Sequence, residues 1–123
     1  MDRRIRRVVE LLAAESHASV QLEELARRVG LGVSRLEHLF KSNMNISIRD
    51  FVRERRLARA AELLATSEER ISVISLRIGF ADVSNFNHAF KKHFGMAPRA
   101  YRDRAHDNEV STLDQEKAEE TKS

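Results

Sequence analysis

Apolar residues recur every three or four positions along most of the chain, which is the spacing of one face of an α-helix. No stretch of strand length alternates apolar and polar residues, so we predict an all-α fold. The pattern predicts seven helices, at about residues 3–15, 20–29, 33–42, 48–66, 71–78, 83–93 and 98–104. The fourth is the longest, and its 19 residues correspond to roughly 28 Å of helix.

Residues with special backbone preferences stand at the predicted helix ends. Gly30 and Gly95 follow helices at positions where a positive φ is often required, and we expect a left-handed conformation at Asn45. Asp82 is a suitable N-cap for the sixth helix. Further boundaries are predicted at the break His17–Ser19, at the capping-box-like pair Ser47 and Asp50, at Gly79, and at Pro98 in the first position of the last helix.

The second half of the chain repeats the pattern of the first. At a shift of 49, the residues Leu22, Leu25, Val29 and Gly30 match Ile71, Ile74, Ile78 and Gly79. At a shift of 50, the residues Ser34, Leu36, Phe40, Lys41, Asn45, Ile48 and Phe51 match Ser84, Phe86, Phe90, Lys91, Gly95, Pro98 and Tyr101. A duplicated helix, glycine turn and helix predicts two helix-turn-helix subdomains, at about residues 20–42 and 71–93, joined by the long linker helix.

The second helix of each predicted subdomain has one apolar face and one polar face. In the first subdomain the polar face carries Ser34, Arg35, Glu37, His38 and Lys41, and in the second it carries Ser84, Asn85, Asn87, His88, Lys91 and Lys92. Such side chains suit base edges in a major groove, with cations for the adjacent phosphates. The candidate phosphate contacts are Lys41, Lys91, Lys92, Arg49 and Arg53. The plainer alternative for the arginines is a solvated helix face.

Charge is unevenly distributed along the chain. Through Arg104 there are 20 Lys and Arg against 13 Asp and Glu, a balance of +7, whereas residues 105–123 have a balance of −4. A basic body favours a polyanionic partner. The acidic and polar segment 105–123 is expected to be a disordered, solvating tail. The alternative is that it competes with DNA for the basic face.

Composition excludes several other classes of protein. The chain has no Cys, which rules out thiol nucleophiles and disulfides and fits a reducing compartment such as the cytoplasm. It has neither a secretion signal nor an apolar run of the roughly 20 residues that a membrane span needs. We expect no membrane association, no metal, no cofactor and no enzymatic activity, since no nucleophile or acid–base constellation is present. A module that binds only proteins is the alternative, but the polar, basic helix faces favour DNA.

Several motifs resemble the DNA-binding domain of the AraC/XylS family of bacterial transcription regulators. The motifs, in order, are Leu25–Gly30, Leu39–Lys41, Arg55–Leu64, Ile71–Phe80, Ser84–Phe86, Ala89–Lys92, Phe94–Pro98 and Tyr101–Arg102. The resemblance covers about residues 8–104. It implies seven helices, with two recognition helices in successive major grooves of duplex DNA, monomeric binding to an asymmetric site, and activation through contact with RNA polymerase.

The resemblance also implies which residues read bases. The family's reading positions correspond to Ser34, Glu37, His38, Val83, Ser84, Asn87 and His88, and Arg35 lies beside them. The sequence departs from the family at Gly32 and Ala97, where a capping Ser is usual, and at Asn45, where Gly is usual. Most family members also carry an effector or dimerisation domain. We therefore expect either a stand-alone member or an excised DNA-binding domain at residues 1–104, with no small-molecule effector site.

Overall fold

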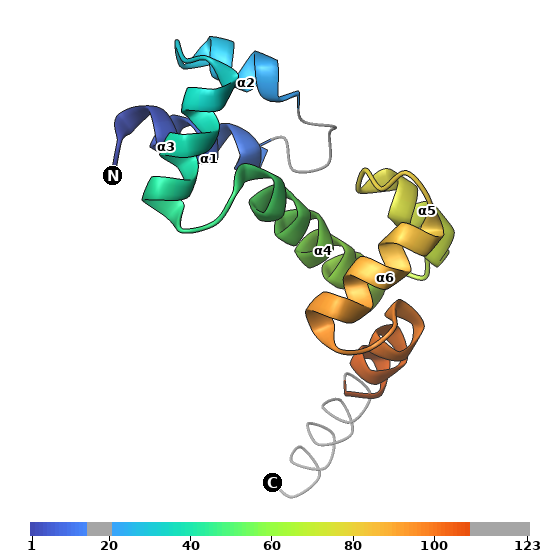
Figure 1. Ribbon diagram of the computed structural model, residues 1–123. Coiled ribbons are helices and arrows are strands. Elements are labelled where there is room, and N and C mark those ends of the chain that lie inside the picture. Colours follow the sequence, from blue (N-terminus) through green and yellow to red (C-terminus); the bar gives the residue numbers. More distant parts are fainter. Residues whose placement is uncertain (15–20, 109–123) are drawn as a thin grey trace, which may run out of the picture. The chain divides into compact units, whose positions relative to one another are not determined.

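The computed structural model describes residues 1–14 and 21–108, and this part of the chain is entirely helical between its turns (Figure 1). Its helices are α1 (Arg3–Ala14), α2 (Leu22–Arg28), α3 (Val33–Met44), α4 (Ile48–Thr66), α5 (Ile71–Arg77) and α6 (Val83–Phe94), followed by a last helix at 98–108. The predicted all-α class with seven helices is thus confirmed for the described residues. The break predicted at His17–Ser19 lies outside them.

Several helix ends differ from the sequence prediction. Helix α2 begins at Leu22 rather than at about residue 20 and ends one residue earlier than expected, at Arg28, and α5 also ends one residue earlier, at Arg77. Helix α3 runs two residues further than expected, to Met44, and α6 runs one residue further, to Phe94. The last helix does not stop near Arg104 but continues to at least residue 108. The expectation of disorder from residue 105 onward is therefore wrong for 105–108, where Ala105 and His106 are half-buried.

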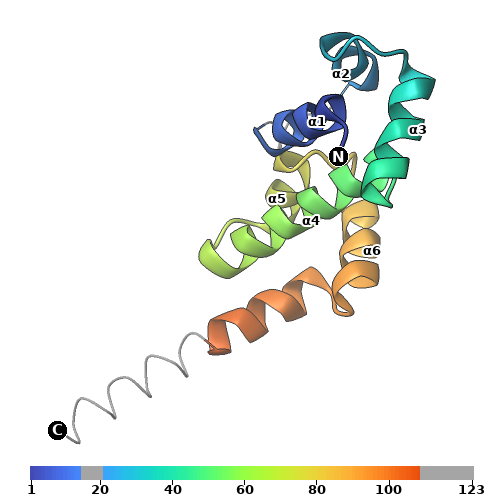
Figure 2. The ribbon, with the colours of Figure 1, turned by 90° about the vertical axis from the view of Figure 1, so that its left-hand side faces the viewer.

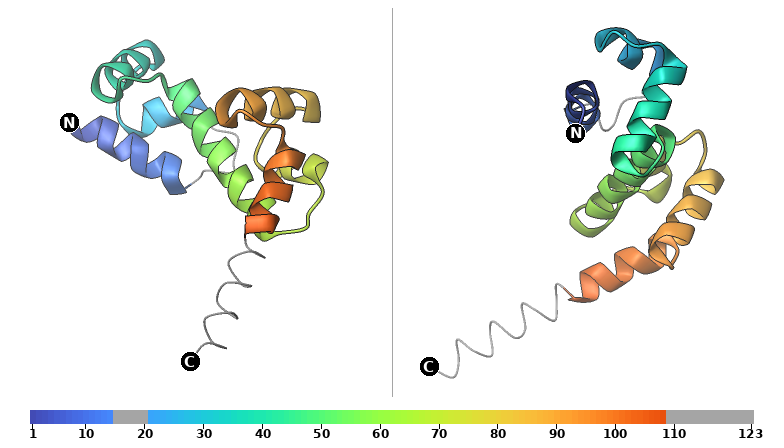
Figure 3. Two further views of the ribbon diagram at one scale, coloured as in Figure 1. Left: turned by 90° about the horizontal axis from the view of Figure 1, so that it is seen from below. Right: turned by 60° about the vertical axis from the view of Figure 1, so that its left-hand side comes forward.

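The chain divides into two compact units, Met1–Arg56 and Leu57–Ser123, and the boundary falls inside α4. In the first unit α3 packs against both α1 and α2 (Figure 2). In the second unit α5 packs against α6 (Figure 3). Each unit has its own hydrophobic core.

The first core is built from one face of each helix of that unit. Ile5, Val8, Leu36 and Phe40 are fully buried there, and Phe51 meets the Phe40 ring edge-on at 5.4 Å. The spacing of three and four along α1 and α3 is the helical period from which these faces were predicted. Burial of these side chains is the main force that holds α3 in place.

The second core repeats this arrangement. Ile74, Phe86 and Phe90 are fully buried, and Tyr101 meets the Phe90 ring edge-on at 5.4 Å. Phe80, in the turn after α5, packs edge-on against Phe86 at the same centroid distance of 5.4 Å. Aromatic pairs with this geometry add to the stabilisation that burial alone gives. These phenylalanines are therefore core residues of the second unit.

The repeat extends to the first helix of each unit, a correspondence that the sequence pattern alone did not reveal. At a shift of 52, buried or half-buried residues of α1 match buried residues in the second half of α4, with Ile5, Val8, Val9, Leu11 and Leu12 matching Leu57, Ala60, Ala61, Leu63 and Leu64. Even a surface ion pair recurs, because Arg7 and Glu10 (3.6 Å) match Arg59 and Glu62 (2.8 Å). Helix α4 thus contributes its first half to one unit and its second half to the other.

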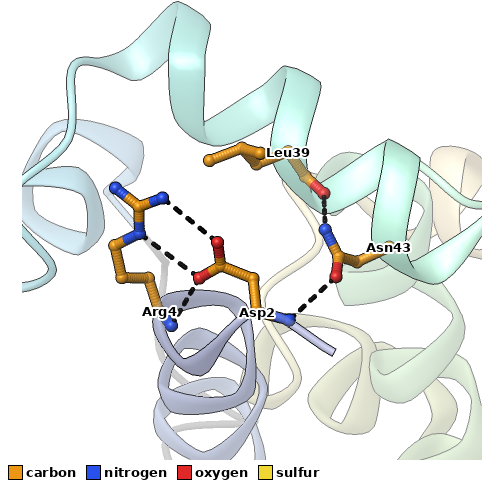
Figure 4. A network of polar contacts seen from close by, with 4 residues as sticks. All are labelled: Asp2, Arg4, Leu39 and Asn43. Carbon is orange, nitrogen blue, oxygen red and sulfur yellow. Dashed lines mark hydrogen bonds and ion pairs between the residues drawn. The ribbon is translucent and has the colours of Figure 1, made fainter.

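Hydrogen bonds fix the start of α1 against α3 (Figure 4). The Asp2 N–H donates to Asn43 Oδ1 at 3.0 Å, and Asn43 Nδ2 donates to the Leu39 carbonyl at 2.8 Å. The Asp2 carboxylate accepts from the Arg4 N–H at 2.8 Å and from the Arg4 guanidinium at 3.1 and 3.3 Å. These bonds lower the pKa of Asp2.

None of the described helices is long and apolar enough to cross a membrane.

Candidate nucleic-acid interface

The second and third helices of each unit are joined by the same hydrogen-bonded turn. The glycines after α2 and α5 have positive φ, 71° at Gly30 and 98° at Gly79. The next residue bonds back to the preceding helix in both cases, with distances of 2.9 Å from the Leu31 N–H and 3.0 Å from the Phe80 N–H. This Schellman closure ends a helix sharply. The same turn therefore leads the chain into α3 and into α6.

The outer face of α3 is exposed along its length. Leu36 and Phe40 are fully buried, which turns the opposite side of the helix toward solvent. The exposed residues include all the α3 candidates, Ser34, Arg35, Glu37, His38 and Lys41. An open hollow of about 450 Å³ is lined by Ser34, Glu37, His38, Lys41 and Ser42. Ser42 was not among the candidates, although it lies one helical turn after His38 and the helical period places it on this face.

Helix α6 presents the corresponding face in the second unit. Phe86 and Phe90 are buried, and the exposed residues include the candidates Ser84, Asn87, His88, Lys91 and Lys92. Val83, the first residue of the helix, is half-buried and offers only part of its side chain to a ligand. Lys91, Lys92 and His93 form a basic last turn, which the helix dipole also favours.

The two candidate recognition helices begin with different caps. At α6 the Asp82 carboxylate accepts from the Asn85 N–H at 2.7 Å, while Asn85 Nδ2 donates to the same carboxylate at 3.1 Å. The Asn85 side chain is therefore engaged in the cap. Asn87 is also exposed, but its side chain makes no bond to the cap. The N-cap of α3 is Gly32, which has no side chain to accept such a bond.

The arginines of α4 fall into two groups. Arg49 and Arg53 are exposed, as a phosphate contact requires. Arg55 is half-buried, with its guanidinium 5.8 Å from the centre of the Phe51 ring. Arg56 is also half-buried, and desolvation lowers its pKa. Packing thus engages Arg55 and Arg56, whereas Arg49 and Arg53 are free to meet an anion.

Comparison with known proteins agrees with the sequence motifs. A family model described as "Helix-turn-helix domain" matches residues 25–104. The arabinose operon regulatory protein of Salmonella typhimurium is 32% identical over 105 residues, which cover 83% of this chain and 37% of that protein. The chain spans only about two fifths of the length of curated relatives such as this one.

Solved structures show the same arrangement of helices. A transcriptional regulator from Chromobacterium violaceum, described as containing an AraC-type DNA-binding domain, has a TM-score of 0.77 and 28% identity, and the match covers 83% of this chain and 91% of that one. The DNA-binding domain of AdpA, solved with a target DNA, has a TM-score of 0.80 at 22% identity, with 87% and 96% covered. At that identity the second match supports the fold alone.

Proposed function

Because the chain belongs to the AraC-type family of helix-turn-helix DNA-binding domains, a non-enzymatic family of transcription regulators, we propose that α3 and α6 enter adjacent major grooves of one DNA duplex and read its sequence. The observation that supports this most directly is the duplication. In each unit the same glycine turn leads into an exposed, polar third helix with a cation toward its C-terminal end. A helix held in this way by its partner is the usual element for reading a major groove.

The exposed side chains have the chemistry that base reading needs. The Asn87 side-chain amide can accept one hydrogen bond and donate another, so it can pair with N6 and N7 of adenine. Arg35 can reach guanine in the same bidentate manner, and Glu37 can accept from the amino group of cytosine. Val83 offers an apolar contact to a thymine methyl. The proposed base-reading set is Ser34, Arg35, Glu37, His38, Val83, Ser84, Asn87 and His88.

Phosphate contacts are assigned to the exposed cations beside these residues. The proposed set is Lys41, Lys91, Lys92, Arg49 and Arg53. Each contact neutralises a phosphate and releases counterions, so affinity falls with salt by about 0.9 log unit per log unit of salt and per contact. DNA binding should therefore weaken steeply as salt rises.

The two reading faces differ, which favours one chain on an asymmetric site. Helix α3 offers Arg35 and Glu37, whereas at the matching positions of α6 Asn85 is held in the cap and Asn87 is exposed. A symmetric dimer would need the same helix on both half-sites. We assign the protein to the bacterial cytoplasm, where such a site is found.

Selection of bound sequences from random duplexes tests this proposal. We expect a non-palindromic site with two unlike halves about one helical turn, or 34 Å, apart, bound by a single chain in sedimentation experiments. Affinity for the selected duplex should exceed that for random duplex at physiological salt. Equal affinity for both duplexes, or a flat response to salt, would contradict sequence-specific reading.

Activation through RNA polymerase is supported by the outer face of α5. Val73 and Leu76 there are 43% and 61% exposed, while the matching positions of α2 are the charged Glu24 and Arg27. The fold of a unit therefore does not require apolar residues at these positions. Replacing Val73 and Leu76 together by Ser should leave DNA affinity unchanged and lower transcription from the target promoter in vitro. Unchanged transcription would contradict a polymerase contact at α5.

A further inference from the structure

The first turns of α1 carry four arginines, Arg3, Arg4, Arg6 and Arg7, which we call the α1 arginine cluster. All four are exposed, and the first turn of the helix contains no acidic residue. The N-terminus of a helix carries a partial positive charge, so cations there oppose the helix dipole. Helix stability does not explain this concentration of positive charge.

Among the residues that the structure describes, ion pairs engage two of these four arginines. Arg4 is held by Asp2 at 3.1 Å, and Arg7 lies 3.6 Å from Glu10 in a pair that is largely exposed. Arg3 and Arg6 have no acidic partner within the part of the chain that the structure describes. Their guanidinium groups are therefore available to an anion from outside the protein.

The second unit shows that the fold itself does not need this surface. In α4, the positions that match Arg3 and Arg4 are Arg55 and Arg56, both half-buried and engaged by packing or desolvation. The position that matches Arg6 is Ala58. The positions of α4 that match Arg3, Arg4 and Arg6 therefore carry no exposed arginine, although the two helical segments correspond in the repeat.

The cluster lies beside the first candidate recognition helix. Asp2 bonds to Asn43 in the last turn of α3, and Asn43 bonds to Leu39 of the same helix (Figure 4). The start of α1 is thereby fixed against the C-terminal half of α3, where Lys41 already provides a cation. The family model matches residues 25–104 and does not include these arginines.

We propose that the α1 arginine cluster binds the phosphate backbone of DNA at the edge of the groove that α3 enters. This inference rests on the proposed function. A guanidinium presents its donors in a planar fork that matches a phosphate in bidentate fashion. Contacts of this kind fix the register of a helix on the duplex and add affinity without adding base specificity.

The test replaces Arg3 and Arg6 together by Gln in the full chain, which removes two charges and keeps a good helix former. Because this variant can no longer neutralise two of the phosphates, the slope of log affinity against log salt should fall by ~1.8. The wild-type protein should accordingly lose ~10-fold more affinity than the variant between 50 and 200 mM salt. The variant should bind selected and random duplexes more weakly by the same factor, and Arg3→Lys with Arg6→Lys should retain the salt slope.

A modified duplex locates the contact. Neutral methylphosphonate linkages are introduced next to the half-site read by α3, first on one flank and then on the other. On one of the two duplexes wild type and the Gln variant should bind equally, because the contact is already absent. Lys117→Gln with Lys122→Gln removes the same charge elsewhere and should leave the salt slope unchanged.

The possible failures are distinguishable. If wild-type protein binds no duplex, the proposed function itself is wrong. If wild type and the Gln variant bind the selected site equally, with the same salt slope, only the arginine assignment fails. It also fails if the Lys117 and Lys122 control loses affinity equally, since net charge then accounts for the effect. A loss seen only in transcription with polymerase present would assign the cluster to an acidic protein surface instead.

Discussion

Two asparagines in the first turns of α6 have different environments. Asn85 donates to the Asp82 carboxylate with its side-chain amide at 3.1 Å, whereas Asn87 is exposed and makes no such bond. Replacing Asn87 by Ala should weaken binding to the selected site by ~1–3 kcal/mol, because the variant cannot make a bidentate contact to one base. Binding competition on duplexes that vary one base pair at a time would measure both the loss and the position affected.

Asn85→Ala is the matched control for this substitution. It removes an amide of the same size from the same helix, but from a side chain engaged in the cap. It should lower the stability of the protein without changing base preference at any position. Equal loss on selected and random DNA after Asn87→Ala would show that Asn87 contacts only the backbone.

The exposed faces could be predicted from the sequence, but the engagement of individual side chains could not. Helical periodicity alone places both asparagines among the solvent-facing residues of α6. The bond from Asn85 to Asp82 depends on a rotamer, and the sequence pattern does not specify one. The arginines of α4 differ for the same reason, since only packing on Phe51 separates Arg55 from its exposed neighbour Arg53.

Substitutions of the two glycines at the turn between α2 and α3 should change the stability of the protein in opposite directions. Gly30 has a φ of 71° and Gly32 has a φ of −75°, and no atom lies within 4 Å of a Cβ added at either position. Gly30→Ala should destabilise the protein by ~1–2 kcal/mol, because an L side chain is strained at positive φ. Gly32→Ser should stabilise it by ~0.5–1 kcal/mol, through a new cap on α3 and a less flexible unfolded chain.

Chemical denaturation followed by circular dichroism would measure both glycine variants. The second unit supports the expected gain at Gly32, because Asp82 occupies the matching position and its side chain does cap α6. A gain in stability from Gly30→Ala, or a loss from Gly32→Ser, would contradict the backbone geometry of this turn.

Helix ends were the part of the fold that sequence predicted least well. Asparagine usually favours loops, so Asn43 was expected to lie beyond α3. In the structure its side chain bonds to both Leu39 and Asp2, and this contact between distant residues keeps it in the helix. The last helix likewise passes residue 104, where Ala105 and His106 are half-buried. The local pattern of apolar residues indicates neither the hydrogen bonds of Asn43 nor the burial of Ala105 and His106.

At the scale of the whole molecule, the linker helix α4 (Ile48–Thr66) contains the boundary between the two units. Its first half belongs to one core and its second half to the other, and its 19 residues form one continuous helix without a loop. The helix spans roughly 28 Å, close to the ~34 Å between successive major-groove entries on one face of DNA. The proposed entry of α3 and α6 into adjacent major grooves predicts two half-sites that lie one helical turn apart.

Reading of adjacent grooves by one chain predicts a strict spacing of the two half-sites. Inserting five base pairs between them should turn the second half-site to the opposite side of the duplex, and inserting ten should restore the side but add a full turn of distance. Both insertions should reduce affinity to about that of a duplex with one half-site, measured by titration at constant salt. Tolerance of the ten-pair insertion alone would mean that the protein can stretch across it. Tolerance of both would mean that the two half-sites are bound independently, which would contradict the reading of adjacent grooves.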